Sequence, residues 1–530
     1  LEGIPLALEL AAARVRSLAV ADINKRLNDR YKLLTGGDRT LQARQQTLRA
    51  LVDWSYDLLE ENEQVLLARL SVFAGGFGLE AAETICGADP LEAMDVLDLI
   101  TSLVEKSLLR VEEHDAGARY RMLETIREYA DEKLALRDEL AATRVAHCDY
   151  FLTFAKASNF GLQGPERADW LRQVDDALDD IRAGTRFALD RGVDPIIAVK
   201  FDVAMLGFWL RQGYITEGRA SVRAALALPE VKASDVAHAH ALYVGAGLAE
   251  SQGDLAEASR MLEDCLALRR GIGKTVDIAA TLSTLAQVRL RSGDAGGALA
   301  NETEALALFR DIGNRVGEAI GLQHLGEIHV WTGDAAAAKT YLDECIVIAH
   351  DIGNLEVESE CAVDLGEVAL EGGDPKTALD RFSSALEIAR AAGDKRGEAA
   401  ALWRMGRASV AAGDLSTART RLAGALRSLE AFEMRGELIE CIEDCATLDA
   451  TAGDPAAATT LYAAADAMRE RYALTRPPQA ERTRRNALDA LRSDLGVAAF
   501  DAAWTAGAAL EMDRALELAR GALSREPALA

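Results

Sequence analysis

The stretch "LQHLGEIHVWTGDAAAAKTYLDECI", Leu322 to Ile346, contains the pattern that organises most of the chain. Its Gly333-Asp334 pair separates two segments that both have helical apolar spacing. Glycine readily ends a helix in a left-handed turn, and aspartate caps the following helix by accepting its unpaired amide hydrogens. The stretch therefore predicts a helical hairpin with its turn at Gly333.

The same glycine recurs at intervals of 40 residues, and aspartate follows it in the last six of the seven copies. A fixed period of this kind indicates stacked copies of one structural unit. The seven glycines are Gly213, Gly253, Gly293, Gly333, Gly373, Gly413 and Gly453.

Small residues recur at two positions behind each glycine, five and twelve residues further along the chain. Because these positions lie two helical turns apart, they let neighbouring helices approach closely. The first position holds Gly218, Ala258, Ala298, Ala338, Ala378, Ala418 and Ala458, and the second holds Ala225, Cys265, Ala305, Cys345, Ala385, Ala425 and Ala465. Cys361, Cys441 and Cys445 are interpreted in the same way, as core residues rather than metal ligands.

These units resemble the tetratricopeptide repeat, with Leu325, Gly326, Gly333, Asp334 and Ala338 at the positions where the family carries its signature. They differ from the usual repeat of roughly 34 residues by a longer loop after the second helix. The resemblance implies an α-solenoid whose inner wall is lined by the first helix of each hairpin. The fold class that we predict is all-α, with a winged-helix domain and one small β-hairpin ahead of the solenoid.

"GIGKT", Gly271 to Thr275, looks like the end of a nucleotide-binding P-loop. It falls where the next units have "DIGNR" and "DIGNL", and Leu268 stands where a P-loop requires glycine. We therefore interpret it as the turn between two repeats.

The first 150 residues carry a second resemblance. "GIPLAL", with Gly3 and Pro5, resembles the Gly-x-Pro motif of the NB-ARC branch of STAND signalling ATPases. Residues 46–86 and about 91–107 have helical spacing, and the alternation around Asp115-Ala116-Gly117 predicts a hairpin wing. "MLETIREYA" stands where that family has a Met-His-Asp signature, so Glu124 takes the place of the aspartate and Leu123 that of the histidine.

The order of these parts resembles the central and C-terminal part of bacterial STAND regulators. We expect the end of the STAND helical domain at 1–45, a winged helix at 46–125, a helical spacer at 126–198, repeats at 199–472 and capping helices at 473–530. The chain starts without methionine inside a helical pattern, so we interpret it as a C-terminal fragment. The resemblance implies that ATP or ADP with Mg²⁺ binds to an upstream nucleotide-binding domain, to which Gly3, Pro5 and Glu124 of this chain contribute cofactor-binding residues. It also implies that this fragment holds no cofactor of its own, no metal and no catalytic residue.

The charge of the chain limits the kinds of partner that it can attract. The 530 residues include 85 acidic and 59 basic ones, for a formal charge of −26, which opposes long-range attraction to nucleic acid or to an anionic membrane. The expected third helix of the winged helix adds Glu92, Asp95, Asp98 and Glu105 against Lys106 alone. Seven cysteines without a compact paired framework fit a reducing cytoplasm. We predict a cytoplasmic protein that itself contacts neither nucleic acid nor membrane.

A binding groove is expected on the inner wall, at positions two, six and ten residues before each glycine. Aromatic and arginine side chains there are of the types that dominate binding hot spots. The alternative is that each aromatic ring packs on the neighbouring helix. The predicted groove residues are Tyr243, Gln287, Arg291, Gln323, Glu327, Trp331, Glu367, Trp403 and Arg407.

The function that we expect is the sensor and switch part of a STAND regulator of transcription. A protein or small-molecule inducer would bind the groove, the winged helix would hold an ADP-locked state, and activation would produce a homo-oligomer. The alternative is a passive scaffold for other proteins, without any nucleotide.

Overall fold

The structure is a computed structural model that describes residues 48–114, 117–162, 166–472 and 474–524. The described chain divides into two compact units, one comprising residues up to Ala157 together with Arg172–Phe201, and the other Ser158–Leu171 with everything from Asp202 onward. The expected Gly-x-Pro helix at 1–45 lies outside the described residues.

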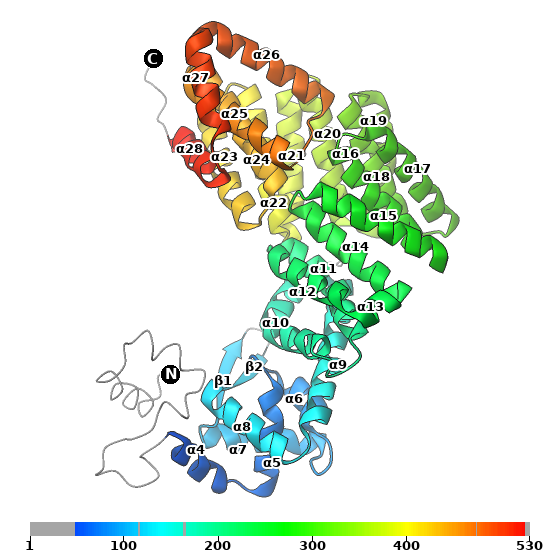
Figure 1. Ribbon diagram of the computed structural model, residues 1–530, viewed down its shortest axis with the longest axis vertical. Coiled ribbons are helices and arrows are strands. Elements are labelled where there is room, and N and C mark those ends of the chain that lie inside the picture. The colour runs from blue at the N-terminus through cyan, green and yellow to red at the C-terminus, as the bar shows by residue number, and fades with distance from the viewer. Residues whose placement is uncertain (1–47, 115–116, 163–165, 473, 525–530) are drawn as a thin grey trace, which may run out of the picture. The chain divides into compact units, whose positions relative to one another are not determined.

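The first unit contains the winged helix and most of the helices that follow it (Figure 1). Its elements are α4 (Leu48–Asp57), α5 (Glu61–Arg69), α6 (Leu79–Cys86), α7 (Val96–Glu105), β1 (Leu109–His114), β2 (Gly117–Met122) and α8 (Glu124–Leu136). The chain continues through α9 (Leu140–Gly161), α10 (Arg167–Leu189) and α11 (Ile196–Gln212), which the two units share.

The predicted hairpin wing is confirmed. Strands β1 and β2 pair antiparallel, with Leu109 opposite Met122 and His114 opposite Gly117. Phe77 adds an isolated bridge to Tyr120 and so ties the chain between α5 and α6 to the wing.

The third helix begins later than its apolar pattern suggested, at Val96 instead of about Leu91. A 3₁₀ turn at Ala93–Asp95 precedes it, closed by a capping box between Glu92 and Asp95. Because that box already satisfies the backbone amides there, it sets the start of the regular helix.

Two buried charges fix the winged helix internally. Glu63 of α5 accepts a hydrogen bond from Ser102 of α7, at 2.5 Å, and pairs with Lys106. Arg69 donates to the carbonyl oxygens of Cys86, Ala88 and Asp89 at 2.6–2.8 Å. It also pairs with Glu139 at 2.6 Å.

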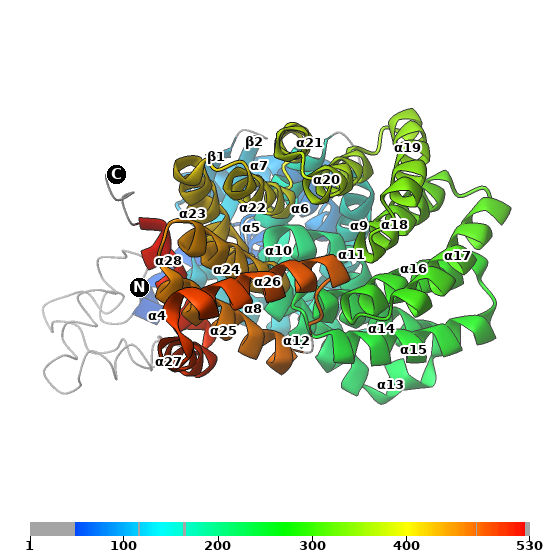
Figure 2. The ribbon, with the colours of Figure 1, turned by 90° about the horizontal axis from the view of Figure 1, so that it is seen from above.

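The second unit is a series of helical hairpins that follow a curve (Figures 1 and 2). The hairpins are α11 with α12 (Ile215–Ala227), α14 (Asp235–Ser251) with α15 (Leu255–Ile272), α16 (Thr275–Arg291) with α17 (Ala295–Asp311), α18 (Arg315–Thr332) with α19 (Ala335–Ile352), α20 (Leu355–Glu371) with α21 (Pro375–Ala391), α22 (Lys395–Ala411) with α23 (Leu415–Ala431), and α24 (Arg435–Thr451) with α25 (Pro455–Tyr472). The short helix α13 (Pro229–Ala233) lies between the first two hairpins.

The predicted turn chemistry is confirmed at the hairpin turns. All seven glycines of the 40-residue period have φ between 78° and 89°, the left-handed region that residues with a Cβ rarely adopt. The aspartates that follow them cap the next helix; the Asp334 carboxylate, for example, accepts from the Ala337 amide at 3.1 Å. The "GIGKT" stretch forms the turn between α15 and α16, where Gly273 ends α15 in the left-handed conformation.

Small residues bring the two helices of a hairpin into contact, as predicted. Every alanine and cysteine at the two small positions is buried, and so are Cys361, Cys441 and Cys445. Gly366 illustrates the close approach, since a Cβ there would lie 2.4 Å from Cε1 of Phe382.

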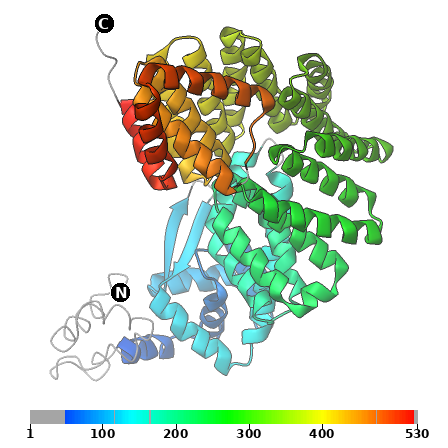
Figure 3. The same cartoon turned by 45° about the horizontal axis from the view of Figure 1, so that its top comes forward.

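Three helices follow the last hairpin: α26 (Pro478–Leu495), α27 (Val497–Ala508) and α28 (Met512–Ser524). Helix α27 packs on α25, and α28 contacts α23, α24 and α25. Helix α26 leaves the last hairpin and reaches α18 (Figure 3). No helix within the described residues has the length and apolar character needed to cross a membrane.

Candidate binding wall of the repeat array

The first helices of the hairpins lie on the inner side of the curve. Each of α14, α16, α18, α20 and α22 contacts the first helix of the next hairpin, and among the described helices successive second helices show no comparable contact. The shorter separation between first helices identifies them as the inner side (Figure 2). We call their facing surfaces the inner wall.

A ladder of polar contacts joins neighbouring first helices along this wall. In each rung, a residue ten positions before one glycine meets a residue nine positions before the next. The rungs are Tyr243–Thr284 at 3.2 Å, Ser283–His324 at 2.9 Å, Gln323–Asp364 at 2.7 Å and Trp403–Asp444 at 2.6 Å. Among the described residues no rung is formed at the corresponding positions, Val363 and Arg404, because valine offers no polar side-chain group; Arg404 pairs with Glu367 instead.

The nine groove residues all belong to these first helices, but they differ in how much of each side chain reaches solvent. Trp331 is half-buried against the apolar core of α16 to α20. The half-buried ring of Tyr243 carries the guanidinium of Arg269 above it, 4.4 Å from the ring centre. Gln323 is buried within its rung with Asp364.

Trp403 lies in the core. Its side chain is 1% exposed, its Nε1 donates to Asp444, and Arg404 lies over its ring at 4.5 Å. The alternative in which an aromatic ring packs on a neighbouring helix therefore describes this position. A partner that approaches the wall would meet Arg404 and Arg407 above the ring.

Charged residues form a second tier nearer the hairpin turns. Arg291 pairs with Glu250 of the preceding first helix. Glu367 accepts from Arg404 at 3.1 Å and pairs with Arg407.

Two inner-wall residues carry a buried N–H group without a hydrogen-bond partner. These are Nε2 of Gln287 and Nε of Arg407. Buried donors are paired in most proteins, so each such group calls for an explanation. A ligand acceptor at the wall would supply one.

His324 forms a buried ion pair that sequence analysis did not find. Its Nδ1 lies 3.2 Å from the carboxylate of Glu302, which is fully buried and also accepts from the Ser283 hydroxyl at 3.0 Å. Burial by itself would lower the pKa of His324, but the charge of Glu302 outweighs that effect and raises the pKa to about 9.

The neighbouring part of the wall holds an excess of carboxyl groups. Removal from bulk water, followed by the charge of Glu356, raises the pKa of Glu360 to about 8, although its side chain still reaches solvent. Burial and the charge of Glu327 keep the pKa of Asp364 well above its usual value. Burial likewise raises the pKa of Asp444 to about 7. A positively charged ligand group would stabilise the ionised forms of these acids.

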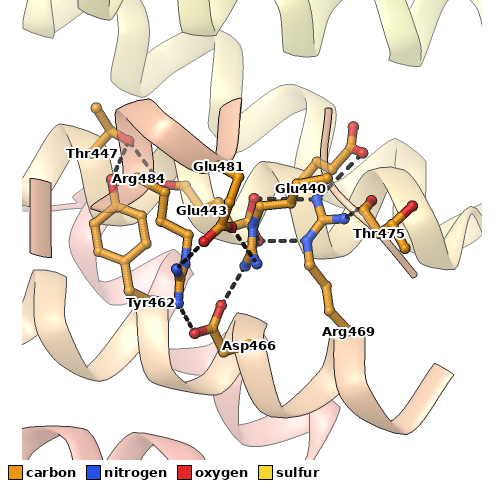
Figure 4. A network of polar contacts seen from close by, with 10 residues as sticks. Glu440, Glu443, Thr447, Tyr462, Asp466, Arg469, Thr475, Glu481 and Arg484 are labelled. Carbon is orange, nitrogen blue, oxygen red and sulfur yellow. Dashed lines mark hydrogen bonds and ion pairs between the residues drawn. The ribbon is translucent and has the colours of Figure 1, made fainter. Parts of the chain in front are cut away.

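A separate network fixes the end of the array to α26 (Figure 4). Glu443 of α24 accepts from Arg469 at 2.6 Å and from Arg476 at 2.5 Å. Asp466 of α25 pairs with Arg476 and with Arg484 of α26. These charges hold α24, α25 and α26 together as one block.

The positions two, six and ten residues before each glycine do not include the second partner of any polar rung, so the sequence prediction lacks the rungs. The partners of the rungs stand one position later, as Thr284, His324, Asp364 and Asp444. Polar residues that recur there with the 40-residue period were a usable signal.

Three residues, Gly3, Pro5 and Glu124, are predicted to lie near a nucleotide. Gly3 and Pro5 lie outside the described residues. Glu124 begins α8, and its carboxylate accepts from Nε of Arg127 at 2.8 Å. That carboxylate is thus engaged within its own helix.

Helix α7 exposes few basic side chains that could contact nucleic acid. Asp98 and Glu105 are exposed on it, and Met94 and Leu97 are exposed beside them. Lys106, at the end of the helix, pairs with Glu63. The absence of direct nucleic-acid binding stays a prediction.

Comparison with known proteins identifies two parts of the chain. The model of a winged helix-turn-helix domain matches residues 59–135, and that of a tetratricopeptide repeat matches residues 318–391. This chain carries a winged helix-turn-helix domain followed by tetratricopeptide repeats. The winged helix and the tetratricopeptide repeats predicted from the sequence are confirmed for these parts, and the NB-ARC resemblance stays a prediction.

Relatives from Mycobacterium tuberculosis share part of the sequence. One, whose name describes a candidate HTH-type transcriptional regulator, is 38% identical over 218 residues, which cover 41% of this chain and 24% of the relative. An uncharacterized protein of the same organism is 43% identical over 143 residues, which cover 27% of this chain and 36% of that protein. The chain thus spans about a quarter and just over a third of the length of these relatives.

Solved structures resemble the chain at low sequence identity. A STAND protein with a tetratricopeptide repeat sensor from Pyrococcus horikoshii has a TM-score of 0.42 at 17% identity, over 84% of this chain and 69% of that one. A Rap protein complexed with Competence and Sporulation Factor has a TM-score of 0.48 at 11% identity, over 71% and 99%. Because both TM-scores are below 0.5, neither structure tells what this chain binds.

Proposed function

We propose that this chain is the sensor and switch part of a transcriptional regulator. The repeat array binds an inducer, either a protein segment or a small molecule, on its inner wall. The winged helix passes the bound state on to the output of the protein. The observation that carries the proposal is the inner wall itself, which presents the half-buried rings of Tyr243 and Trp331 and also holds two buried donors, on Gln287 and Arg407, that have no hydrogen-bond partner among the described residues.

The charge of the wall favours an inducer with a positive group and a hydrogen-bond acceptor. Besides burial, the charges of Glu356 and Glu327 raise the pKa of Glu360, and the charges of Glu327 and Glu360 raise the pKa of Asp364. Placing a cation beside them relieves the repulsion between the carboxylates. The acceptor of the same ligand would satisfy the unpaired donors.

The name of the Mycobacterium tuberculosis relative, which describes an HTH-type transcriptional regulator, supports control of transcription as the output of the protein. By that analogy, the inducer changes the transcription of a limited set of genes. We assign the contact with DNA to another part of the regulator, because α7 exposes acidic and apolar groups.

A more specific part of the proposal concerns a bound nucleotide. In it, ATP or ADP with Mg²⁺ binds an upstream domain, the winged helix holds the ADP-bound resting state, and activation assembles a homo-oligomer. The described residues do not fit a nucleotide by themselves, since Glu124 is paired with Arg127.

Transcript profiling in the source organism tests the proposal. A gene deletion is compared with chromosomal Trp331→Ala and Val347→Ala variants; Val347 is 62% exposed on α19, a second helix, and serves as the matched control. We expect the deletion to change a limited set of transcripts, Trp331→Ala to reproduce that change at normal protein level, and Val347→Ala to match wild type. Unchanged transcripts in the deletion strain would refute the regulator.

The alternative of a passive scaffold makes a different prediction. A scaffold holds its partners without a switch, so an inner-wall ligand would leave the nucleotide affinity of the complete protein unchanged. A regulator of the proposed kind couples the two, typically by roughly 1–3 kcal/mol.

A further inference from the structure

One turn between repeats departs from the others. The four earlier turns of this type place Gly273, Gly313, Gly353 and Gly393 in the left-handed conformation, with φ between 67° and 81°. At the equivalent position of the next turn stands Glu433, with φ of 54°. A residue with a Cβ is disfavoured there, and such a conformation persists only where the surroundings hold it.

The surroundings of Glu433 come from the opposite end of the array. Its carboxylate accepts from the Thr216 hydroxyl at 2.7 Å and from Nε2 of Gln252 at 2.6 Å. Thr216 lies in the first turn of α12, and Gln252 follows α14. Gln252 also donates to Thr216 at 3.1 Å and accepts from Arg219 at 2.8 Å. The turn at Glu433 follows the sixth hairpin, α22 with α23, and is called the sixth turn; these contacts join it to the first two hairpins.

Three further contacts accompany this one. Phe432 packs against Gly213, where a Cβ would lie 3.1 Å from its ring. Arg211 donates to Glu356 at 2.6 Å, and the Thr475 hydroxyl donates to the carbonyl of Arg291 at 2.9 Å. We call this set, centred on Glu433, the closing seam.

The closing seam differs in chemistry from the joints between consecutive hairpins. Those joints are lined by fully buried alanine, cysteine and leucine side chains, whose separation would expose apolar surface to water. The seam combines hydrogen bonds and an ion pair, which water replaces at a small net cost, with an apolar contact through Met434 and Leu474, which share a buried cluster with Leu255. Among the described helices, none of the first two hairpins packs along a helix of the last three hairpins. The seam is therefore the joint of the array that opens most easily.

We propose that Glu433 is a clasp, which holds the repeat array as a closed turn and releases it along the closing seam. Opening separates the first two hairpins from the sixth turn and widens the access to the inner wall. Each hairpin stays intact, so the motion is that of rigid pieces about one weak joint. The clasp needs no ligand in order to exist and does not depend on the proposed function.

Hydrogen exchange followed by mass spectrometry on the 530-residue chain tests the clasp. The main variant is Glu433→Gly, which removes the carboxylate and places in the turn the residue that its conformation favours. We expect unchanged helicity and about tenfold faster exchange of the amides at residues 214–218 and 252–254, as loss of a charge-assisted hydrogen bond implies. If Glu433 served only the turn, glycine would leave exchange at these distant segments unchanged or slower, and that result would overturn the proposal.

A second variant approaches the clasp from its other side. Gln252→Leu should speed exchange at residues 431–436 to a similar extent, and the double variant should add little to either single one. Gly313→Glu is the control, because it places a glutamate in an equivalent turn where a Cβ has nothing within 4 Å. It should leave the seam unchanged. Independent, additive effects of the two clasp variants would also overturn the proposal.

Discussion

Replacing His324 by asparagine should make the stability of the repeat array depend less on pH. In the folded chain the ion pair with Glu302 raises the pKa of His324 from 6.5 to about 9. A group whose pKa rises on folding contributes its full stability below the unfolded pKa and loses that contribution as the pH rises through the folded one. The contribution of His324 is therefore complete below pH 6.5 and lost by about pH 9.

The size of the effect follows from the same two values. One pKa unit corresponds to about 1.4 kcal/mol, so the difference between 6.5 and about 9 corresponds to about 3 kcal/mol. The Glu302 carboxylate is fully buried and only 17% of the His324 side chain is exposed, so solvent screens the pair little.

The assay is urea unfolding of wild type and His324→Asn, followed by circular dichroism at several pH values between 6 and 9.5. Asparagine keeps a donor near Glu302 but carries no charge. We expect the stability difference between the two proteins to be about 3 kcal/mol larger at pH 6 than at pH 9.5. The raised pKa values of Glu360, Asp364 and Asp444 lower the stability of both proteins with rising pH, so the comparison cancels most of that loss. A difference that stays constant across this pH range would refute the reasoning.

Two further substitutions test the packing of the chain. Gly366→Ala places a methyl group against the Phe382 ring and should cost about 1–3 kcal/mol in unfolding free energy, whereas Gly424→Ala, in a helix where a Cβ meets nothing within 4 Å, should be neutral or stabilising; equal effects in thermal unfolding would contradict this account. Arg69→Met removes the donors to three carbonyl oxygens and the partner of Glu139, so we expect a loss of about 3 kcal/mol and faster hydrogen exchange at residues 79–90, while Arg110→Met, exposed on β1, should leave that exchange unchanged.

The hairpins could be predicted from the sequence because their determinants are local. A glycine that must adopt a left-handed conformation and an aspartate that caps the following helix act within a few residues, as Gly333 and Asp334 do. The small residues behind them report contact within the same hairpin. The period of 40 residues then repeats this information seven times.

The contacts between hairpins could not be predicted in the same way. Whether Trp403 faces a partner or the core depends on how far each first helix is rotated relative to the next, and the turn residues do not specify that angle. In the structure Trp403 faces the core, where it donates a hydrogen bond to Asp444 of the next first helix. The closing seam is more remote still, since it depends on curvature summed over several hairpins, and Glu433 meets Gln252 only when that sum is correct.

The polar rungs of the inner wall limit how the repeats of the array can be rearranged. Each rung needs a suitable pair, such as the amide of Gln323 with the carboxylate of Asp364. If one repeat were copied and inserted next to its parent, the residue ten positions before the parent's glycine would meet the residue nine positions before the copy's glycine. These two residue types come from different rungs and are not a matched pair. The repeats are therefore not interchangeable modules. A repeat moved to another place in the array would have to change its inner-wall side chains before the rungs could form again.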